Sequence, residues 1–131
     1  MTVKDLEDFQ SLVRQSEQIY EELERIRVRI EHPTIAQITG MPKGSPKLHD
    51  EIIAVFMDKE AMYKELLLDI QDRQMRIEER LSEMTDETSK ELLRLRYIMQ
   101  YSWGRIGKTM GYERTQVWRK KKKAIKEFTK V

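Results

Sequence analysis

The sequence predicts an all-α protein in which a long, coiled-coil-like antiparallel helical hairpin precedes a C-terminal helix-turn-helix. Two long stretches carry apolar residues at helical spacing. The segment between them, HPTIAQITGMPKGSPK, holds all three prolines of the chain, which is typical of a loop. A short segment with one apolar side, a glycine turn and a basic segment follow. We therefore expect a hairpin domain over residues 1–84 and a helix-turn-helix domain over residues 85–131.

The first long stretch, residues 3–31, should form one helix with a wide apolar stripe. Its inward residues fall into three rows spaced by seven: Phe9, Ser16, Leu23 and Ile30; Leu12, Ile19 and Ile26; Leu6, Val13 and Tyr20. Three adjacent rows are more than the two positions that a coiled-coil seam requires. The pattern therefore predicts that this helix contacts more than one neighbour.

The second long stretch predicts a helix from about residue 46 to about residue 84, with Ser45 as its N-cap and Pro46 at the first helical position. Its seam consists of Phe56, Tyr63, Ile70, Ile77 and Met84, with Ile53, Leu67 and Leu81 as companions. At 1.5 Å per residue this helix would be ~55 Å long. A small globule cannot bury a stripe of that length, so we expect the helix to pair with the first one, to dimerise, or both.

A third helix is expected to begin at Thr85 or Thr88, because Thr88 and Glu91 have the spacing of a capping box. The helical period predicts that its inward residues are Leu92, Leu95 and Met99, flanked by Leu93 and Tyr97.

Two further helices should follow, joined by a turn at Gly111. Ser102 is a suitable N-cap for the first of them, and Gly111 is suited to the left-handed backbone that commonly ends a helix. The inward face of this helix is predicted to hold Trp103, Ile106, Gly107 and Met110. Because the two helices must cross closely near Gly107, a residue without a side chain suits that position.

The last helix is expected to start near Glu113 and to have two unlike sides. With Val117 as the inward reference, the same side holds Lys121, Ala124, Ile125 and Phe128, and the opposite side holds Thr115, Arg119, Lys122 and Lys126. The apolar period continues past the run Lys120–Lys123. The run is therefore predicted to lie within an amphipathic helix and not in a disordered tail.

The charge of the chain is divided unequally between its parts. Residues 101–131 hold ten Lys or Arg and two Asp or Glu, a net charge of +8, whereas the first hundred residues carry −6. A basic end of this kind is typical of a surface that binds nucleic acid, and less often of one that binds a membrane. A helix fits the major groove, with its N-terminal residues at the base edges and later basic residues along the phosphates.

The stretch LLRLRYIMQYSWGRIGKTMGYERTQVWRKKKKAIKEF resembles region four of bacterial sigma factors. It is more specifically similar to the small sigma-like regulators of phages and prophages, of the RinA and ArpU kind. The resemblance covers residues 88–128 and extends loosely to the hairpin. It implies a DNA-binding transcriptional regulator of phage late genes in the cytoplasm of a bacterial host, with double-stranded DNA as its partner.

By position, the resemblance places the base-reading residues of the recognition helix at Arg114, Thr115, Trp118 and Arg119. Further DNA contacts are expected from Lys122, Lys123, Lys126, Arg105 and Lys108. The sequence departs from the pattern at Glu113, where Ser or Thr is usual, and at Lys120, where an apolar residue is usual. Trp118 is bulky for its position, and contact with DNA and packing against the core both remain open for it.

Other classes of function find little support in the sequence. No phosphate-binding loop, nucleophile elbow or pair of acid and base carboxylates stands out, so we expect no enzyme and no cofactor. Cysteine is absent, and His32 and His49 lack the spacing of metal ligands. No stretch reaches the ~18 apolar residues of a membrane span, and no signal peptide is expected at the N-terminus.

The hairpin is expected to mediate self-association, as a dimer or a larger homo-oligomer, or contact with another protein such as RNA polymerase. A promoter-melting sigma factor is disfavoured, because the N-terminal half lacks the clustered aromatic and basic residues that hold single-stranded DNA. Two alternatives remain. One is an oligomeric DNA-packaging component similar to a phage terminase small subunit, and the other is a coiled-coil scaffold with a basic end.

Overall fold

The computed structural model describes residues 1–32 and 46–130, and 88% of these residues are helical. The all-α prediction is confirmed, since the described residues contain no β-strand. The loop and the Ser45 cap expected between the long helices lie outside the described residues. The helices form two compact units: Met1–Leu12 with Ile70–Val131, called here the terminal unit, and Val13–Asp69, the middle unit.

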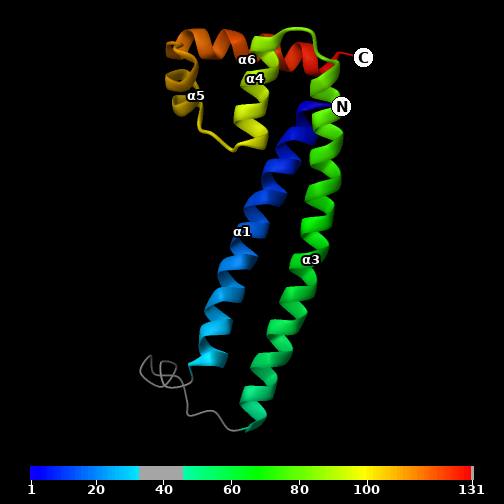
Figure 1. Cartoon of the computed structure of the whole chain (residues 1–131), viewed down its shortest axis with the longest axis vertical. Coiled ribbons are helices and arrows are strands. Elements are labelled where there is room, and N and C mark those ends of the chain that lie inside the picture. Colours follow the sequence, from blue (N-terminus) through cyan, green and yellow to red (C-terminus); the bar gives the residue numbers. More distant parts are fainter. Residues whose placement is uncertain (33–45, 131) are drawn as a thin grey trace. The chain divides into compact units, whose positions relative to one another are not determined.

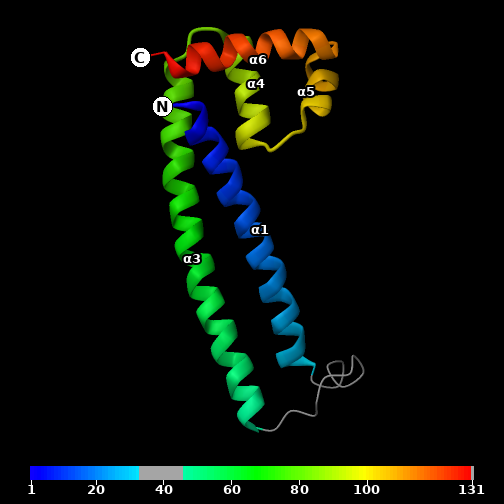
Figure 2. The same cartoon turned by 180° about the vertical axis from the view of Figure 1, so that it is seen from behind.

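The middle unit consists of parts of α1 (Val3–Glu31) and α3 (Pro46–Glu83). The two helices run antiparallel and side by side (Figure 1 and Figure 2). Lys59 donates to the carboxylate of Glu22 at 2.7 Å, and this bond holds the pKa of Glu22 below its usual range. The rings of Tyr20 and Tyr63 meet at a tilt, with 6.0 Å between their centroids.

The predicted stripe of α1 is confirmed for its central row, because Phe9, Ser16 and Leu23 are buried. Ser16 satisfies its hydroxyl within the helix by donating to the carbonyl of Val13 at 2.6 Å, so the seam tolerates a polar residue there. The prediction for Leu67 is wrong, since that side chain is exposed and the adjacent Leu66 is half-buried. At the same heptad position, Leu81 is fully buried and Ile53 is half-buried, so the error is confined to Leu67.

The terminal unit contains the principal core of the chain. It gathers the first turns of α1, the last turns of α3, and α4 (Glu87–Leu93), a π-helical turn η1 (Arg94–Ile98), α5 (Trp103–Met110) and α6 (Arg114–Thr129). Its fully buried side chains are Leu6, Phe9, Ile77, Leu81, Leu92, Leu93, Ile106, Ala124 and Phe128. Both long helices contribute their ends to this core.

The start of α4 corrects the predicted cap. Neither Thr85 nor Thr88 is the N-cap; the cap is Asp86, whose carboxylate accepts from the Thr88 amide at 3.3 Å and from the Ser89 hydroxyl at 2.7 Å. Asp is among the best N-cap residues because its oxygens satisfy amides that have no partner in the first turn. The capping-box spacing of Thr88 and Glu91 was therefore misleading.

The π-helical turn explains a second correction. Met99 was predicted to point inward, yet it is 54% exposed, whereas Tyr97 is buried. A π turn holds one more residue than an α turn, so every side chain after it is rotated from its expected position. Gln100 then ends the segment with a positive φ of 61°, and its side chain donates to the Tyr97 carbonyl at 2.7 Å.

Arg80 of α3 forms hydrogen bonds with the C-terminal end of α6. Its guanidinium donates to the carbonyls of Phe128, Glu127 and Lys130, each at 2.8 Å. These carbonyls belong to the end of a helix, where intrahelical partners are lacking. In the same region the Glu127 carboxylate accepts from the amides of Thr85 and Asp86, at 2.8 and 3.3 Å. The last turn of α6 is therefore held from both α3 and the start of α4.

Candidate nucleic-acid interface

Helix α5 has the boundaries that the sequence predicts. The Ser102 hydroxyl accepts from the Arg105 amide at 3.2 Å and so caps the first turn. Gly111 ends the helix in the left-handed conformation, with φ of 74°, which a residue without a Cβ adopts at little cost. Ile106 and Gly107 are buried, and Trp103 and Met110 are half-buried beside them.

Gly107 lies where α5 approaches the start of α6 most closely. A Cβ at this position would lie 3.0 Å from the Tyr112 carbonyl oxygen and 3.3 Å from Val117 Cγ2. The close approach predicted from the sequence is thus confirmed. By contrast, a Cβ at Gly104, one turn earlier, would meet no atom within 4 Å.

Helix α6 begins with a capping box in place of the expected Ser or Thr cap. The Glu113 carboxylate accepts from the Gln116 amide, and the Gln116 side chain accepts from the Glu113 amide at 2.9 Å. Glu113 also places a negative charge near the positive end of the helix dipole. The inner side is as predicted, with Val117, Ala124 and Phe128 buried and Lys121 and Ile125 half-buried.

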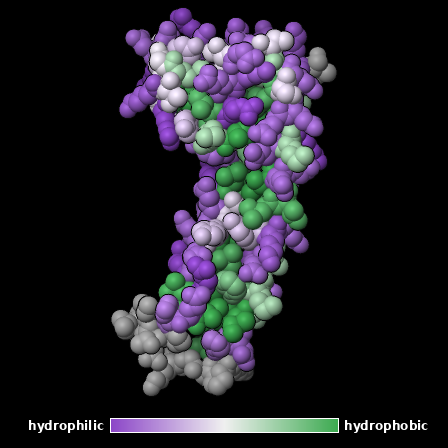
Figure 3. Space-filling view, viewed as in Figure 1, coloured by the Kyte–Doolittle hydropathy of each residue, from purple (hydrophilic) through white to green (hydrophobic). Residues whose placement is uncertain are grey.

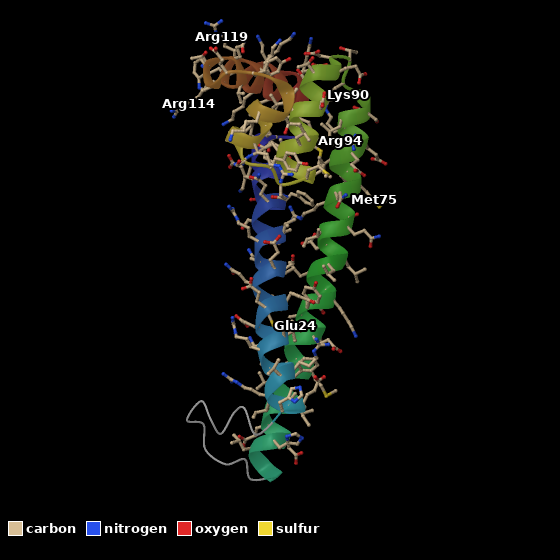
Figure 4. The ribbon with its side chains drawn as sticks, turned by 60° about the vertical axis from the view of Figure 1, so that its left-hand side comes forward. Glu24, Met75, Lys90, Arg94, Arg114 and Arg119 are labelled. Atoms are coloured by element: carbon tan, nitrogen blue, oxygen red, sulfur yellow. The ribbon has the colours of Figure 1, made fainter. Side chains whose placement is uncertain are left out.

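The outer side of α6 carries six of the nine residues predicted to contact DNA. Arg114, Thr115, Trp118, Arg119, Lys122 and Lys126 are all exposed. Figure 4 shows Arg114 and Arg119 projecting outward from α6, away from Lys90 and Arg94. Trp118 is 57% exposed, so it does not cover the core, and the ammonium of Lys122 lies 3.7 Å from the centroid of its ring.

The other three predicted residues are placed differently. Lys123 pairs with the Asp86 carboxylate at 3.3 Å, so its charge is already partly neutralised. Arg105 is exposed and lies over the ring of Tyr101, 3.7 Å from its centroid. Lys108 is exposed and lines a cleft between α5 and α6 together with Arg114 and Trp118.

This cleft, called here the α5–α6 cleft, has a volume of about 510 Å³. Its lining residues are Trp103, Gly104, Gly107, Lys108, Tyr112, Arg114, Val117, Trp118 and Lys121. Sequence reasoning did not find it, and it placed Trp103 and Lys121 on inward faces. The sequence feature that bears on the cleft is the glycine at position 104. A glycine there indicates a cleft only once the crossing of α5 and α6 is known.

Two carboxylates stabilise the base of α6. The hydroxyl of Ser89 lowers the pKa of Asp86, with help from Lys123, and the amide of Thr85 lowers the pKa of Glu127. Both groups are therefore ionised near neutral pH. They accept from backbone amides, from the hydroxyls of Ser89 and Thr85, and from the ammonium of Lys123. Within the described residues, no three His, Asp or Glu side chains gather in a way that would hold a metal ion.

Residues 87–131 are similar to the WGR domain. The WGR match spans 45 of the 131 residues, from the first residue of α4 to the end of the chain, and it includes Trp103, Gly104 and Arg105 in sequence. It covers both α5 and α6, and therefore the whole cleft. Comparison with curated proteins and with solved structures gave no significant match. The WGR match and the all-helical fold are compatible with binding to nucleic acid.

No described helix is both long enough and apolar enough to cross a bilayer.

Proposed function

We propose that the protein binds double-stranded DNA sequence-specifically and regulates transcription of phage or prophage genes. In this proposal α5 and α6 form a helix-turn-helix, and α6 enters the major groove as the recognition helix. Arg114, Thr115, Trp118 and Arg119 face base edges, and Lys122 and Lys126 lie along the phosphates. Arg105 and Lys108 contact the backbone from α5.

The observation that carries the proposal is the outer side of α6. Within the part of the chain that the structure describes, Arg114, Arg119, Lys122 and Lys126 form no ion pair, although the chain is rich in carboxylates. The long helices carry ion pairs of neighbouring residues, such as Asp72–Arg76 and Glu60–Lys64. Four unpaired cations on one side of one helix are suited to a polyanion.

The similarity to the WGR domain supports the same class of partner. The WGR domain is a nucleic-acid-binding module in some proteins. The match covers the helices to which the sequence resemblance assigns the DNA contacts. The WGR match and the resemblance to region four of sigma factors therefore both favour nucleic-acid binding at the C-terminal end of the chain.

We further propose that the hairpin joins two copies of the chain. In the middle unit, large apolar side chains remain exposed on α3, among them Met57, Met62 and Leu68. Leu68 is 67% exposed and continues a row of uncharged residues spaced by seven, Ala54 and Ala61. Figure 3 shows hydrophobic surface along the long helices. A row with this spacing is the pattern by which two identical helices pack. RNA polymerase is the alternative partner for this surface.

The proposed function is tested by selecting sequences from a random pool of duplex DNA. The expected result is one enriched motif, bound by the full chain, with altered base preference when Arg119→Ala is selected in parallel. Expression of a reporter gene placed downstream of the motif should then change when the protein is present. Enrichment without a motif contradicts sequence specificity, and a motif without any effect on the reporter favours a packaging role over regulation.

A further inference from the structure

The α5–α6 cleft has the size and lining of a ligand site. A volume of about 510 Å³ falls within the range of sites for small molecules. Both tryptophans of the chain line it, together with Tyr112. The position of Gly104 keeps one wall open, since a Cβ there would meet no atom within 4 Å. The cleft is thus lined by aromatic residues, and the neighbouring side chains do not fill it.

The two tryptophans differ in how much ring surface is open. The guanidinium of Arg96 and the ammonium of Lys121 each lie 4.8 Å from the centroid of the Trp103 ring, so that ring is already covered by cations. Trp118 is 57% exposed, and one cation, Lys122, lies over it. The remaining surface of Trp118 is therefore the available platform for stacking a flat ring.

The rim of the cleft is basic. Lys108, Arg114 and Lys121 line it from both helices, and none of the three forms an ion pair within the described residues. A ligand that matches this lining has a flat aromatic part and a negative charge beside it. Base stacking on an aromatic ring with cations along the backbone is how proteins hold unpaired nucleotides.

We propose that the α5–α6 cleft binds a nucleotide whose base is not paired, with the base stacked on Trp118 and the phosphate at Lys108 and Arg114. This inference rests on the proposed DNA binding for its setting, because Lys108, Arg114 and Trp118 belong to both surfaces. The nucleotide can come from two sources, a free mononucleotide or an unpaired position in a DNA strand. Only the second source adds contacts from the outer side of α6.

The experiment compares three probes on the full chain: a fully paired DNA hairpin, the same hairpin with one bulged adenine, and deoxyadenosine monophosphate. Tryptophan fluorescence reports on the cleft, because both tryptophans line it. The bulged hairpin should bind roughly tenfold more tightly than the paired one, as one stacked base provides. Binding of the free nucleotide identifies it as a ligand by itself, whereas binding of the bulged hairpin alone identifies the strand as the source.

Gly104→Leu is the decisive variant, because it fills the cleft from a position with free space and replaces glycine by a better helix former. It should abolish the preference for the bulge and any response to the free nucleotide, while its affinity for the paired hairpin stays within about twofold. Trp118→Phe should retain most of the preference, and Trp118→Ala should lose it. Lys126→Ala, outside the cleft, should weaken both hairpins equally.

The outcomes separate this proposal from the proposed function. If the wild type binds the paired hairpin but shows neither preference for the bulge nor response to the nucleotide, the cleft proposal is overturned and DNA binding stands. If no DNA binds, the proposed function fails, and the free nucleotide still tests the cleft. An unchanged bulge preference in Gly104→Leu also overturns the cleft proposal.

Discussion

Arg80 Nε lies 2.8 Å from the carbonyl oxygen of Phe128 and donates a hydrogen bond to it. The guanidinium also lies 6.0 Å from the centroid of the Phe128 ring. One residue of α3 therefore binds both the backbone and the side chain of a fully buried residue in the last turn of α6. The proposed recognition helix is thus anchored at the end opposite to the one that would read bases.

Arg80→Ala should destabilise the terminal unit by about 2–3 kcal/mol, because it removes charge-assisted bonds to three helix-end carbonyls. The measurement is urea unfolding followed by circular dichroism. Arg76→Ala is the matched control. Arg76 lies one turn earlier on the same helix, its side chain is 66% exposed, and Asp72 is its one ion-pair partner among the described residues, so its loss should cost less than about 0.5 kcal/mol. Equal effects in the two variants would show that the contacts of Arg80 contribute nothing.

Acid should loosen the junction of α4 and α6. The folded state lowers the pKa of Glu127, chiefly through the Thr85 amide, and the pKa of Asp86, chiefly through the Ser89 hydroxyl. A lowered pKa stabilises the fold above the unfolded pKa, and this stabilisation is lost as the pH falls through the folded pKa. Thermal unfolding should therefore move to lower temperature as the pH falls below about 4.3, the ordinary pKa of Glu.

The double variant Glu127→Gln with Asp86→Asn keeps side-chain acceptors but cannot titrate. Its melting temperature should be lower than that of the wild type at pH 7 and should depend less on pH below about 4.3. If its acid transition matches that of the wild type, these two carboxylates are not the groups responsible.

The two glycines of α5 should respond in opposite directions to the same substitution. Gly107→Ala places a Cβ 3.0 Å from a backbone oxygen, so it should destabilise the fold by about 1–3 kcal/mol. Gly104→Ala meets open space and should stabilise by up to about 1 kcal/mol through helix propensity. Differential scanning calorimetry of both variants provides the measurement. A stable Gly107→Ala protein would show that the helices can separate without cost.

DNA affinity should fall steeply with salt. If the five cations Arg114, Arg119, Lys122, Lys123 and Lys126 neutralise roughly five phosphates, the slope of log K against log salt should be about −4.5. Lys122→Ala should reduce the slope by about one. Lys123→Ala should reduce it less, because Asp86 already pairs with that ammonium. Fluorescence anisotropy at several salt concentrations measures both variants, and a slope near zero contradicts binding through phosphates.

The long helices should respond to charge according to burial. Ile77 is 1% exposed in the terminal unit, so Ile77→Asp should destabilise by at least about 4 kcal/mol through an unpaired buried carboxylate. Leu68→Asp should leave helicity unchanged, because Leu68 is 67% exposed, but it should halve the mass of an assembly built on that row. Sedimentation at tens of micromolar measures the mass. A wild type that sediments as a monomer contradicts the proposed assembly.

Helical periodicity predicted the elements of this chain because long amphipathic segments repeat one signal many times. The inner side of α6, the Ser102 cap and the left-handed Gly111 followed from local rules and are confirmed. Errors arose where two local rules competed. Thr88 with Glu91 matched a capping box, yet Asp86 is the better acceptor and has the correct spacing to both Thr88 and Ser89.

The candidate site was predicted only in part, because it depends on contacts between distant residues. Spacing along one helix placed Thr115, Arg119, Lys122 and Lys126 on the outer side, where they are exposed, whereas Arg114 and Trp118 were assigned through the family resemblance. Spacing could not show that Asp86, 37 positions earlier, pairs with Lys123, nor that α5 and α6 cross so as to leave a cleft. The ion pair and the cleft both depend on how helices pack against one another, and the residue pattern of a single helix does not predict that packing.

The π-helical turn Arg94–Ile98 gives this chain a tolerance for change in length. A π turn closes its hydrogen bonds over one residue more than an α turn, as Arg94 and Met99 do here at 2.9 Å. Deleting one residue within the turn would therefore restore an ordinary α-helix without cutting the connection to α5. The side chains beyond it would then return to the register in which Met99 points inward. A variant that lacks one residue of the turn should therefore keep α4 and α5 while exchanging the residue that faces the core.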